Sequence, residues 1–357
     1  METRLLARLT AYTPGEQPRD KKYIKLNTNE NPYPPCPKIQ KKKINAEDFR
    51  LYPDPDCRVL KEALADTLRV PPSHIFTGNG SDEVLSFAFA AFFDADNGPV
   101  LFPEVTYSFY PVYCRFYGLP FRETAVNNDL SIDFSSFTES KADAGVIFPN
   151  PNAPTGIAAD RKTIRRILTA RPKDRIVIID EAYIDFGGES AVELTGEFEN
   201  LLITGTFSKS RSLAGLRLGY AVGNPKLIQS LEKVKNSFNS YTVNRFTQEC
   251  AVDALRDVGY FEKRRDEVIR TRERIADELR KRGWDVLPSL ANFLFAAHPT
   301  MPGEAVYRRL KDEGILVRYF DLPKTRNRVR ISVGTPEEMK VFLRTVDGWN
   351  NDVSQLR

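Results

Sequence analysis

The sequence predicts an α/β fold, in which helices cover both faces of a mainly parallel β-sheet and a smaller α+β domain follows. Between residues 75 and 223, short apolar runs alternate with amphipathic stretches of helical spacing, which is typical of repeated strand–helix units. The runs are continuous rather than alternating in polarity, as expected of strands covered on both faces. From about residue 225 the pattern changes to long charged helices, so we expect a second unit towards the C-terminus.

The 357 residues are enough for one large domain and a smaller one. We expect an N-terminal arm over residues 1–45, a large cofactor-binding domain over residues 46–255 and a small domain over residues 256–357. Prolines and polar residues crowd residues 27–35, which favours an extended arm. We expect this arm to pack with the small domain.

Local patterns predict the individual elements. A helix over residues 57–70 has apolar residues at helical spacing, with Asp56 as its predicted N-cap. Near the other end, Thr335-Pro-Glu-Glu338 predicts a capping box with proline at the first position of a final helix. Between them we expect, in order, a strand at 75–77, a helix at 81–93, strands at 100–102 and 145–148, a helix at 160–170, strands at 175–179, 200–203 and 218–222, a helix at 259–282, and strands at 292–296 and 328–333.

Charge, cysteine and histidine content exclude several classes of function. The 52 basic and 48 acidic residues nearly balance, so bulk charge predicts no nucleic-acid and no membrane partner. Four widely spaced cysteines and two isolated histidines offer no metal site and no histidine-based triad. The first residues lack the apolar core of a signal peptide, and no later run is long and apolar enough to span a bilayer. We therefore expect a soluble cytoplasmic protein.

Lys209 follows the apolar run at residues 201–206, which has the pattern of a buried strand. A lysine placed there is partly desolvated, loses its proton more readily and can attack an aldehyde to form a Schiff base. Ser208 and Arg217 are a hydroxyl donor and a planar cation, the groups that a phosphate ester needs. Together the three residues indicate pyridoxal phosphate as the cofactor. This stretch alone leaves a second interpretation open, in which Lys209 caps the strand and Arg217 lies on a solvated loop.

A glycine-rich turn at residues 78–83 follows the predicted strand at 75–77 and opens a helix near Ser81. Its glycines allow a tight turn, and the free N–H groups at the helix start favour an anion such as a phosphate. Such a turn is weak evidence alone. The turn supports phosphate binding mainly in combination with Ser208 and Arg217, which also suit a phosphate.

Asp180 ends the predicted strand at 175–179, and Tyr183 follows it closely. A carboxylate at the end of a buried parallel strand points into the crevice where ligands of open α/β sheets bind. Opposite a pyridine nitrogen it keeps that nitrogen protonated, which makes the ring an electron sink, and Tyr183 could donate to the phenolic oxygen of the ring. A helix cap or a Mg²⁺ ligand explains Asp180 equally well. Tyr107 is a candidate for stacking on a flat cofactor, although a lone aromatic residue more often belongs to the core.

Arg318 and Arg330 each interrupt an apolar strand pattern. An arginine at a buried strand position needs an anionic partner, because leaving it unpaired costs several kcal/mol. A structural salt bridge and a bound substrate satisfy this need equally well, so the residues alone leave both interpretations open.

Seven short motifs occur in order along the chain. They are Asn29-Glu-Asn-Pro32, Tyr52-Pro53, Gly80-Ser-Asp-Glu83, Pro151-Asn-Ala-Pro-Thr-Gly156, Asp180-Glu-Ala-Tyr183, Ser208-Lys209 with Ala214-Gly-Leu-Arg217, and Arg330-Ile-Ser-Val-Gly-Thr335. In this order the chain resembles the class II, fold-type I pyridoxal-phosphate aminotransferases, and most closely the histidinol-phosphate aminotransferases. The resemblance runs from about Tyr12 to the last predicted helix. Each motif is modest alone, whereas seven in sequence are very specific for the superfamily.

The resemblance implies roles at the matching positions. Lys209 would hold the cofactor covalently and move the proton between the substrate α-carbon and the cofactor. Asp180 would pair with the ring nitrogen, Tyr183 with the phenolic oxygen, and Tyr107 would stack on the ring. The cofactor phosphate would be held by the backbone amides of Ser81 and Asp82, by Ser208 and Arg217, and by the partner subunit's Tyr52, so that the active sites of a homodimer are shared.

At the substrate end, the resemblance implies that Arg318 and Arg330 grip an anionic group, with Tyr12 of the arm nearby. The group is the phosphate of histidinol phosphate or a carboxylate of glutamate. The chain departs from the family at Ala153, where an asparagine often hydrogen-bonds the phenolic oxygen of the cofactor. Asn152 or Asn150 is a candidate to supply that bond, whose loss is expected to cost about 1 kcal/mol.

The function that the resemblance implies is transamination between glutamate and imidazoleacetol phosphate, which yields histidinol phosphate in histidine biosynthesis. An aromatic amino-acid aminotransferase and a phosphothreonine decarboxylase of the same fold stay open as alternatives. A regulator that uses this fold as a ligand sensor is disfavoured, because residues 1–30 are too few for a DNA-binding module. A dehydrogenase is also disfavoured, because no G-x-G-x-x-G motif opens the first strand–helix unit.

Overall fold

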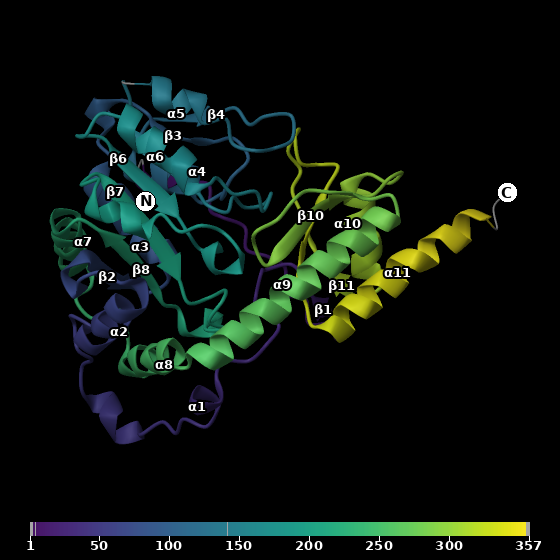
Figure 1. Cartoon of the computed structure of the whole chain (residues 1–357), viewed down its shortest axis with the longest axis horizontal. Helices are drawn as coiled ribbons and strands as arrows, with labels where there is room; N and C mark the ends of the chain where they lie inside the picture. The colour runs from purple at the N-terminus through teal and green to yellow at the C-terminus, as the bar shows by residue number, and fades with distance from the viewer. Residues whose placement is uncertain (1–2, 4, 141, 355–357) are drawn as a thin grey trace.

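The structure, a computed structural model, describes residues 3, 5–140 and 142–354. Within these residues the strands form sheets of seven, four and two strands. Figure 1 shows the seven-stranded sheet and its helices as the larger part of the molecule, with the C-terminal segment forming a smaller part beside it. The extreme ends of the predicted arm and of the predicted small domain lie outside the described residues.

The larger sheet is mainly parallel, as the sequence predicts. Its strand order is β2-β8-β7-β6-β5-β3-β4. β8 is antiparallel to both of its neighbours, β2 and β7, whereas the other neighbouring pairs are parallel. The strands are β2 (Ile75–Gly78), β3 (Val100–Pro103), β4 (Phe121–Thr124), β5 (Gly145–Pro149), β6 (Ile176–Asp180), β7 (Leu201–Thr206) and β8 (Gly219–Gly223). β2, β3, β5, β6 and β7 are buried along their whole length, which confirms that the continuous apolar runs are covered strands.

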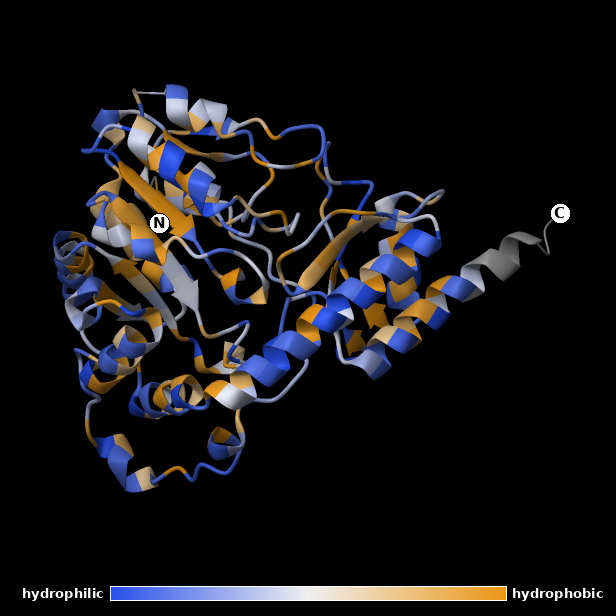
Figure 2. Cartoon of the chain, in the orientation of Figure 1, coloured by the Kyte–Doolittle hydropathy of each residue, from blue (hydrophilic) through white to orange (hydrophobic). Residues whose placement is uncertain are grey.

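Helices cover both faces of this sheet. Successive strand residues point to opposite faces, so Ile178 packs into one core cluster, whereas Val177 and Ile179 pack into another. The helices are α2 (Arg58–Leu68), α3 (Ser81–Phe92), α4 (Tyr110–Tyr117), α5 (Ser135–Glu139), α6 (Arg161–Ala170), α7 (Pro225–Phe238) and α8 (Arg245–Arg256). α3, α4 and α7 contribute to the first cluster, and α5 and α6 contribute to the second. Figure 2 shows the resulting contrast between hydrophobic strands and helices that are hydrophilic on their outer sides.

At the helix caps, one prediction is confirmed, one is wrong, and one cap was not predicted. Asp160 accepts the Thr163 N–H at 2.8 Å and so caps α6. At the last helix the predicted capping box forms, because Thr335 and Glu338 exchange side-chain and backbone hydrogen bonds of 2.7 and 3.2 Å. The predicted cap of α2 by Asp56 is wrong. The chain turns at Cys57, which has a left-handed φ of 49°, and this turn brings Asp54 rather than Asp56 to the N–H of Arg58, at 3.0 Å.

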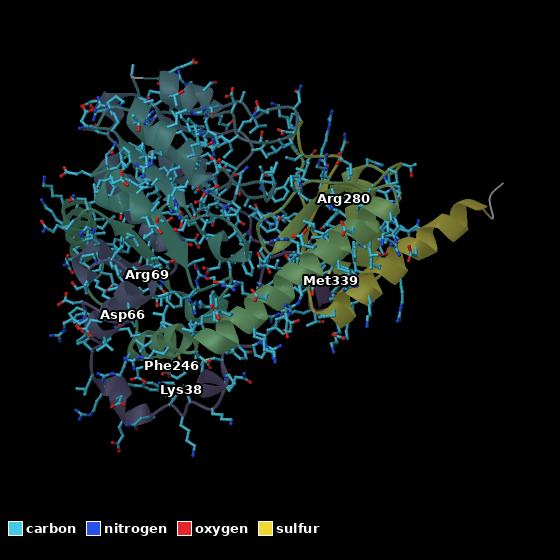
Figure 3. All side chains as sticks on the ribbon, in the orientation of Figure 1. Lys38, Asp66, Arg69, Phe246, Arg280 and Met339 are labelled. Atoms are coloured by element: carbon cyan, nitrogen blue, oxygen red, sulfur yellow. The ribbon has the colours of Figure 1, made fainter. Side chains whose placement is uncertain are left out.

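The smaller part contains a four-stranded antiparallel sheet packed against helices. Its strand order is β12-β13-β10-β9, formed by β9 (Asp285–Val286), β10 (Phe293–Ala297), β12 (Arg318–Tyr319) and β13 (Val329–Ser332). The helices are α9 (Val258–Lys281), α10 (Gly303–Asp312) and α11 (Pro336–Ser354), and all three contribute to its core. In Figure 1, α9 runs from the larger part into the smaller part. Figure 3 places Arg280 of α9 and Met339 of α11 in the smaller part, and Asp66 and Phe246 in the larger.

The arm is tied to the smaller part by a two-stranded parallel sheet. β1 (Ile24–Lys25) pairs with β11 (Ile315–Leu316), and Leu26 is buried in the same core as α9 and α10. Because β1 is held by this pairing, residues 27–31, which follow it, start from a defined position in the smaller part. The remaining short helices are α1 (Pro37–Gln40) and 3-10 turns at Leu6–Arg8, Ala46–Arg50, Pro72–His74, Ala95–Asn97, Ile184–Phe186, Val192–Gly196 and Ala214–Leu216.

Candidate active site

A cavity of about 410 Å³ opens at the carboxyl ends of β6 and β7 and is closed by the arm and by the small sheet. This is the edge at which ligands of parallel α/β sheets bind. Most of the residues singled out in the sequence line it, namely Tyr12, Ser81, Asp82, Tyr107, Asp180, Tyr183, Ser208, Lys209, Arg217, Arg318 and Arg330. Tyr52 and Asn152 are not among its lining residues.

Lys209 lies just beyond the end of β7, where its amine faces the cavity. Its Nζ donates to the Thr28 carbonyl at 3.2 Å and lies 5.8 Å from the centre of the Tyr183 ring. The amide of Asn31 donates to the carbonyls of Lys209 and Ser210, at 3.1 and 3.2 Å. The arm therefore holds the backbone of Lys209 in place, whereas the amine at the end of its side chain can change position.

Asp180 is a buried carboxyl group at the end of β6, 5% exposed. It accepts hydrogen bonds from the Ala182 N–H at 3.2 Å, from Thr204 at 3.3 Å and from Tyr110 at 3.4 Å. Burial raises its pKa to about 6, and these donors only partly offset that rise. No ion pair joins it to a basic side chain anywhere in the described chain, so a cationic ligand group in the cavity would satisfy it.

At the other side of the cavity, the start of α3 and Arg217 form a cationic, donor-rich corner. Gly80 has a φ of +88°, and a Cβ there would lie 2.6 Å from the Arg217 guanidinium. A Cβ on Gly219 would lie 2.3 Å from the Ser81 nitrogen, so the two glycines allow a close approach that side chains would block. Arg217 donates to Asp82 at 3.0 Å. The first amides of α3 and a guanidinium thus face one corner, which suits an anion.

Tyr107 and Tyr12 supply aromatic walls. The Tyr107 hydroxyl donates to Asp82 at 2.7 Å, and burial raises the pKa of Tyr107 well above its usual value, with a further contribution from the Asp82 charge. Its ring stands edge-on to Tyr110, with 5.7 Å between centroids. Tyr12 of the arm packs on Phe109 at 4.4 Å. Aromatic rings that line a cavity suit a planar ligand.

Two arginines face the opposite end of the cavity without carboxylate partners. Arg330 lies between the rings of Phe293 and Phe320, each 5.4 Å from its guanidinium, and donates to the Asn27 carbonyl at 3.0 Å. Burial lowers the pKa of Arg330, and its Nε has no hydrogen-bond partner. Arg318 donates to the carbonyls of Thr13 and Pro14 of the arm, at 3.0 and 3.2 Å. The salt bridge that the sequence left open is absent for both arginines within the described residues, and an anionic ligand would complete their bonding.

Two predicted site residues lie elsewhere. Tyr52 is 77% exposed and stacks on Tyr241 with 4.4 Å between centroids. Asn152 is buried, its amide donates to Val105 at 2.9 Å and to Thr155 at 3.3 Å, and its Oδ1 is unpaired. The residue that does line the cavity at this loop is Ala153.

Sequence reasoning placed Tyr12 of the arm near the site but missed the part that residues 27–30 play in the cavity wall. Asn27, Thr28, Asn29 and Glu30 line the cavity, whereas the sequence analysis gave Asn29 and Glu30 only as part of a motif and gave Asn27 and Thr28 no site role. The pattern of strand ends points to β6 and β7, but it cannot indicate that an irregular segment far away in the sequence crosses them. The sequence analysis also missed Thr204, which donates to Asp180. It could have been expected, because it lies opposite Asp180 on the neighbouring parallel strand.

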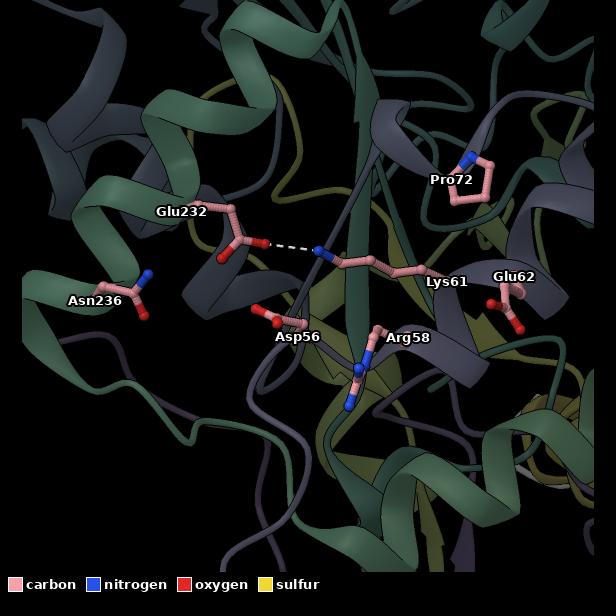
Figure 4. A pocket seen from close by; sticks show the side chains of 7 residues that line it. All are labelled: Asp56, Arg58, Lys61, Glu62, Pro72, Glu232 and Asn236. Carbon is pink, nitrogen blue, oxygen red and sulfur yellow. Dashed lines mark hydrogen bonds and ion pairs between the residues drawn. The ribbon is translucent and has the colours of Figure 1, made fainter.

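A second cavity, of about 360 Å³, lies between α2 and α7 (Figure 4). Lys61 and Glu232 form an ion pair of 2.7 Å across it, so its main charges already satisfy each other. In the described part of the chain, no helix is long and apolar enough to cross a membrane, and no group of three or more histidine, cysteine or acidic side chains could hold a metal ion.

Known proteins resemble this chain along nearly its whole length. The family model "Aminotransferase class I and II" matches residues 21–346. The histidinol-phosphate aminotransferase of Syntrophus aciditrophicus (strain SB) is 50% identical over 347 residues, which cover 96% of each chain.

Solved structures agree in fold. The histidinol-phosphate aminotransferase of Clostridium acetobutylicum has a TM-score of 0.82 at 25% identity, covering 92% of this chain and 99% of that one. That of Sinorhizobium meliloti, solved in complex with pyridoxal-5'-phosphate, has a TM-score of 0.81 at 24% identity, covering 91% and 90%. The match of the family model over residues 21–346 and the 50% identity over 347 residues show that the chain belongs to the class I and II aminotransferase family.

Proposed function

We propose that this chain is a pyridoxal-phosphate-dependent aminotransferase that moves an amino group between glutamate and imidazoleacetol phosphate, forming histidinol phosphate. The names of relatives near 50% identity support the reaction. The single observation that carries the proposal is one cavity lined by an amine, a buried carboxyl group, an anion-binding corner and two arginines without carboxylate partners.

The residues present fit pyridoxal phosphate. Asp180 is buried without a cation and suits a protonated ring nitrogen, and the space kept clear by Gly80 and Gly219 lies beside the donors that a phosphate needs. When bound, pyridoxal phosphate supplies an aldehyde that joins an amine and a ring that accepts electrons from the substrate α-carbon.

The chain's own residues orient that group. Asp180 would hold a proton on the ring nitrogen, Tyr183 would donate its hydroxyl proton to the phenolic oxygen, and Tyr107 would pack against the ring. The amides of Ser81 and Asp82, together with Ser208 and Arg217, would bind the phosphate. Arg217 now donates to Asp82 and would share its donors with the phosphate.

The Lys209 amine carries out the proton transfer. Asn31 holds the Lys209 carbonyl, whereas Nζ donates to the Thr28 carbonyl at 3.2 Å, a bond that it would give up to act on a substrate. As a general base, Lys209 would take up the proton from the substrate α-carbon and hold it at Nζ.

The substrate's anionic group binds at the arginine end. Arg330 is held between two rings and directed by Asn27, which pre-organises its donors for a phosphate or a carboxylate. Arg318 bonds only to arm carbonyls, so a substrate anion can replace them at little cost. Tyr12 closes this end.

The proposal also assigns roles to Asn152 and to the three predicted parts of the chain. Asn152 would have to rotate towards the cofactor, and its unpaired Oδ1 is the one observation that favours this. Residues 46–255 would bind the cofactor, while residues 1–45 and 256–357 would close on the substrate.

A homodimer would bring the partner subunit's Tyr52 to the cofactor phosphate. On this chain Tyr52 is surrounded by exposed apolar side chains, with Ile44 56%, Phe49 70% and Leu51 48% exposed, which a second copy would cover. Light scattering should give the mass of a dimer, and Tyr52→Phe should weaken cofactor binding severalfold. A monomer with full cofactor affinity would contradict this part of the proposal.

The reaction itself is tested by mixing the cofactor-loaded protein with histidinol phosphate, phenylalanine or phosphothreonine and following the visible absorbance of the cofactor. Rapid conversion to the amine form by histidinol phosphate alone is expected. Conversion mainly by phenylalanine would instead assign an aromatic aminotransferase, and release of carbon dioxide from phosphothreonine would assign a decarboxylase.

A further inference from the structure

Asn29 of the arm is buried, 1% exposed, and joins three distant segments of the chain. Its backbone has a φ of 54°, in the left-handed region that few residues other than glycine adopt. A residue held in this conformation with its side chain buried needs compensating bonds, and Asn29 has four of them.

These four bonds fix the orientation of the side-chain amide. The Asn29 N–H donates to Ser332 Oγ at 2.8 Å, so the Ser332 hydroxyl proton is free to be donated to Asn29 Oδ1, at 3.0 Å. The Asn292 amide donates to the Asn29 carbonyl at 3.0 Å. With Oδ1 turned to Ser332, the NH₂ group of Asn29 faces Tyr183 and donates to its hydroxyl oxygen at 3.0 Å.

This arrangement decides what Tyr183 can do. A hydroxyl oxygen that accepts from an amide keeps its own proton for another acceptor, and the incoming bond strengthens the donation. Tyr183 lines the cavity, so its proton is directed there. The charged groups that face Tyr183 are Lys209, with Nζ 5.8 Å from the ring centre, and Arg330, whose charge acts on it.

We propose that Asn29 is a positioning residue. By donating to the oxygen of the Tyr183 hydroxyl, it directs the proton of that hydroxyl to the phenolic oxygen of the cofactor. Through Ser332 it also couples that donation to β13, the strand that carries Arg330 two residues earlier. The inference rests on the proposed function and adds a residue to it. Asn29 also lines the cavity, and in this proposal it acts through Tyr183.

The test is a pH titration of the visible absorbance of the cofactor-loaded protein. A donor to the phenolic oxygen favours the unprotonated form of the bound cofactor, so its loss raises the pH midpoint of the absorbance change. Tyr183→Phe should raise this midpoint most. Asn29→Gly keeps the left-handed backbone, removes the amide, and should raise the midpoint by roughly half a unit. In the Tyr183→Phe background, Asn29→Gly should cause no further shift.

Two more variants separate positioning from packing. Asn292→Ala removes a bond to the Asn29 backbone only, and it should lower thermal stability without moving the midpoint. Asn29→Asp places an acceptor against Tyr183, draws the hydroxyl proton away from the cofactor, and should raise the midpoint more than Asn29→Gly does.

An unchanged midpoint in Asn29→Gly, or equal shifts with and without Tyr183, would overturn the inference while leaving the proposed function intact. If the unsubstituted protein gains no visible absorbance from pyridoxal phosphate, the proposed function is wrong and this inference falls with it.

Discussion

The two ends of the cavity are built in different ways. At the phosphate corner, Ser81 and Asp82 follow β2, Arg217 precedes the antiparallel neighbour β8, and two glycines set their spacing. At the arginine end, Arg318 and Arg330 come from the small sheet and bond to carbonyls of the arm, about three hundred residues earlier in the chain. The first end is built within one sheet, whereas the second is assembled from segments that lie far apart in the sequence. We infer that cofactor binding depends on the sheet and that substrate binding depends on closure of the arm.

The largest expected effect lies at the junction of the two ends. Lys209→Ala should lower the turnover number by about 10⁴-fold, because both the covalent attachment and the general base are lost. Cofactor and substrate should still bind at their own ends. Steady-state rates and equilibrium binding measure the two quantities separately, and activity within tenfold of the unsubstituted protein would contradict the role given to Lys209.

Asp180 provides the next effect, on the cofactor side. In the folded protein without cofactor, burial raises its pKa from 3.8 to about 6, so the folded state binds more protons than the unfolded state between these values. Stability should therefore fall as the pH rises through this window, by about 3 kcal/mol from this group. Asp180→Asn should remove that part of the pH dependence. Glu181, whose pKa burial raises to about 7, remains in both proteins and serves as the common background.

Denaturant titrations at several pH values between 4 and 7 would measure this difference. Equal pH slopes for the two cofactor-free proteins would show that Asp180 is ionised at its ordinary pKa, and they would weaken its assignment to a ring nitrogen.

Substitutions at the arginine end should raise the Michaelis constant, KM, for the substrate. Arg330→Gln should raise KM for histidinol phosphate by about 50-fold, since a pre-organised charged contact is lost. Arg318→Gln should raise KM by roughly tenfold, because the hydrogen bonds of that side chain go to carbonyls of the arm. Cofactor affinity should stay unchanged in both variants. A loss of cofactor affinity would break the separation between the two ends.

The smallest effect should come from the arm itself. Tyr12→Ala removes the ring packed on Phe109 and should raise KM by about threefold. Phe109→Leu offers a matched control, since it weakens the same packing from the large-sheet side. Similar shifts in both would support a closing role for the contact, and a change in turnover alone would argue against it.

The same division explains what could be predicted from the sequence. The buried strands and the residues at their ends follow from local patterns, so Asp180, Lys209 and the α3 turn were found and lie together as expected. The α2 cap was assigned to the wrong aspartate because a left-handed turn at Cys57 changes which carboxylate reaches the helix. Asn29 has no local signal, because its role depends on Ser332, Asn292 and Tyr183, which only the folded chain brings to it.

The measurement that tests the account most directly compares histidinol phosphate with histidinol, which lacks the phosphate, as amino donors to the cofactor-loaded protein. In the unsubstituted protein we expect conversion of the cofactor to be at least about a hundredfold more efficient with histidinol phosphate. Arg330→Gln should remove most of that preference while leaving the cofactor bound. Equal efficiency with both donors, or a preference that survives the substitution, would contradict the assignment of the arginine end to the substrate phosphate.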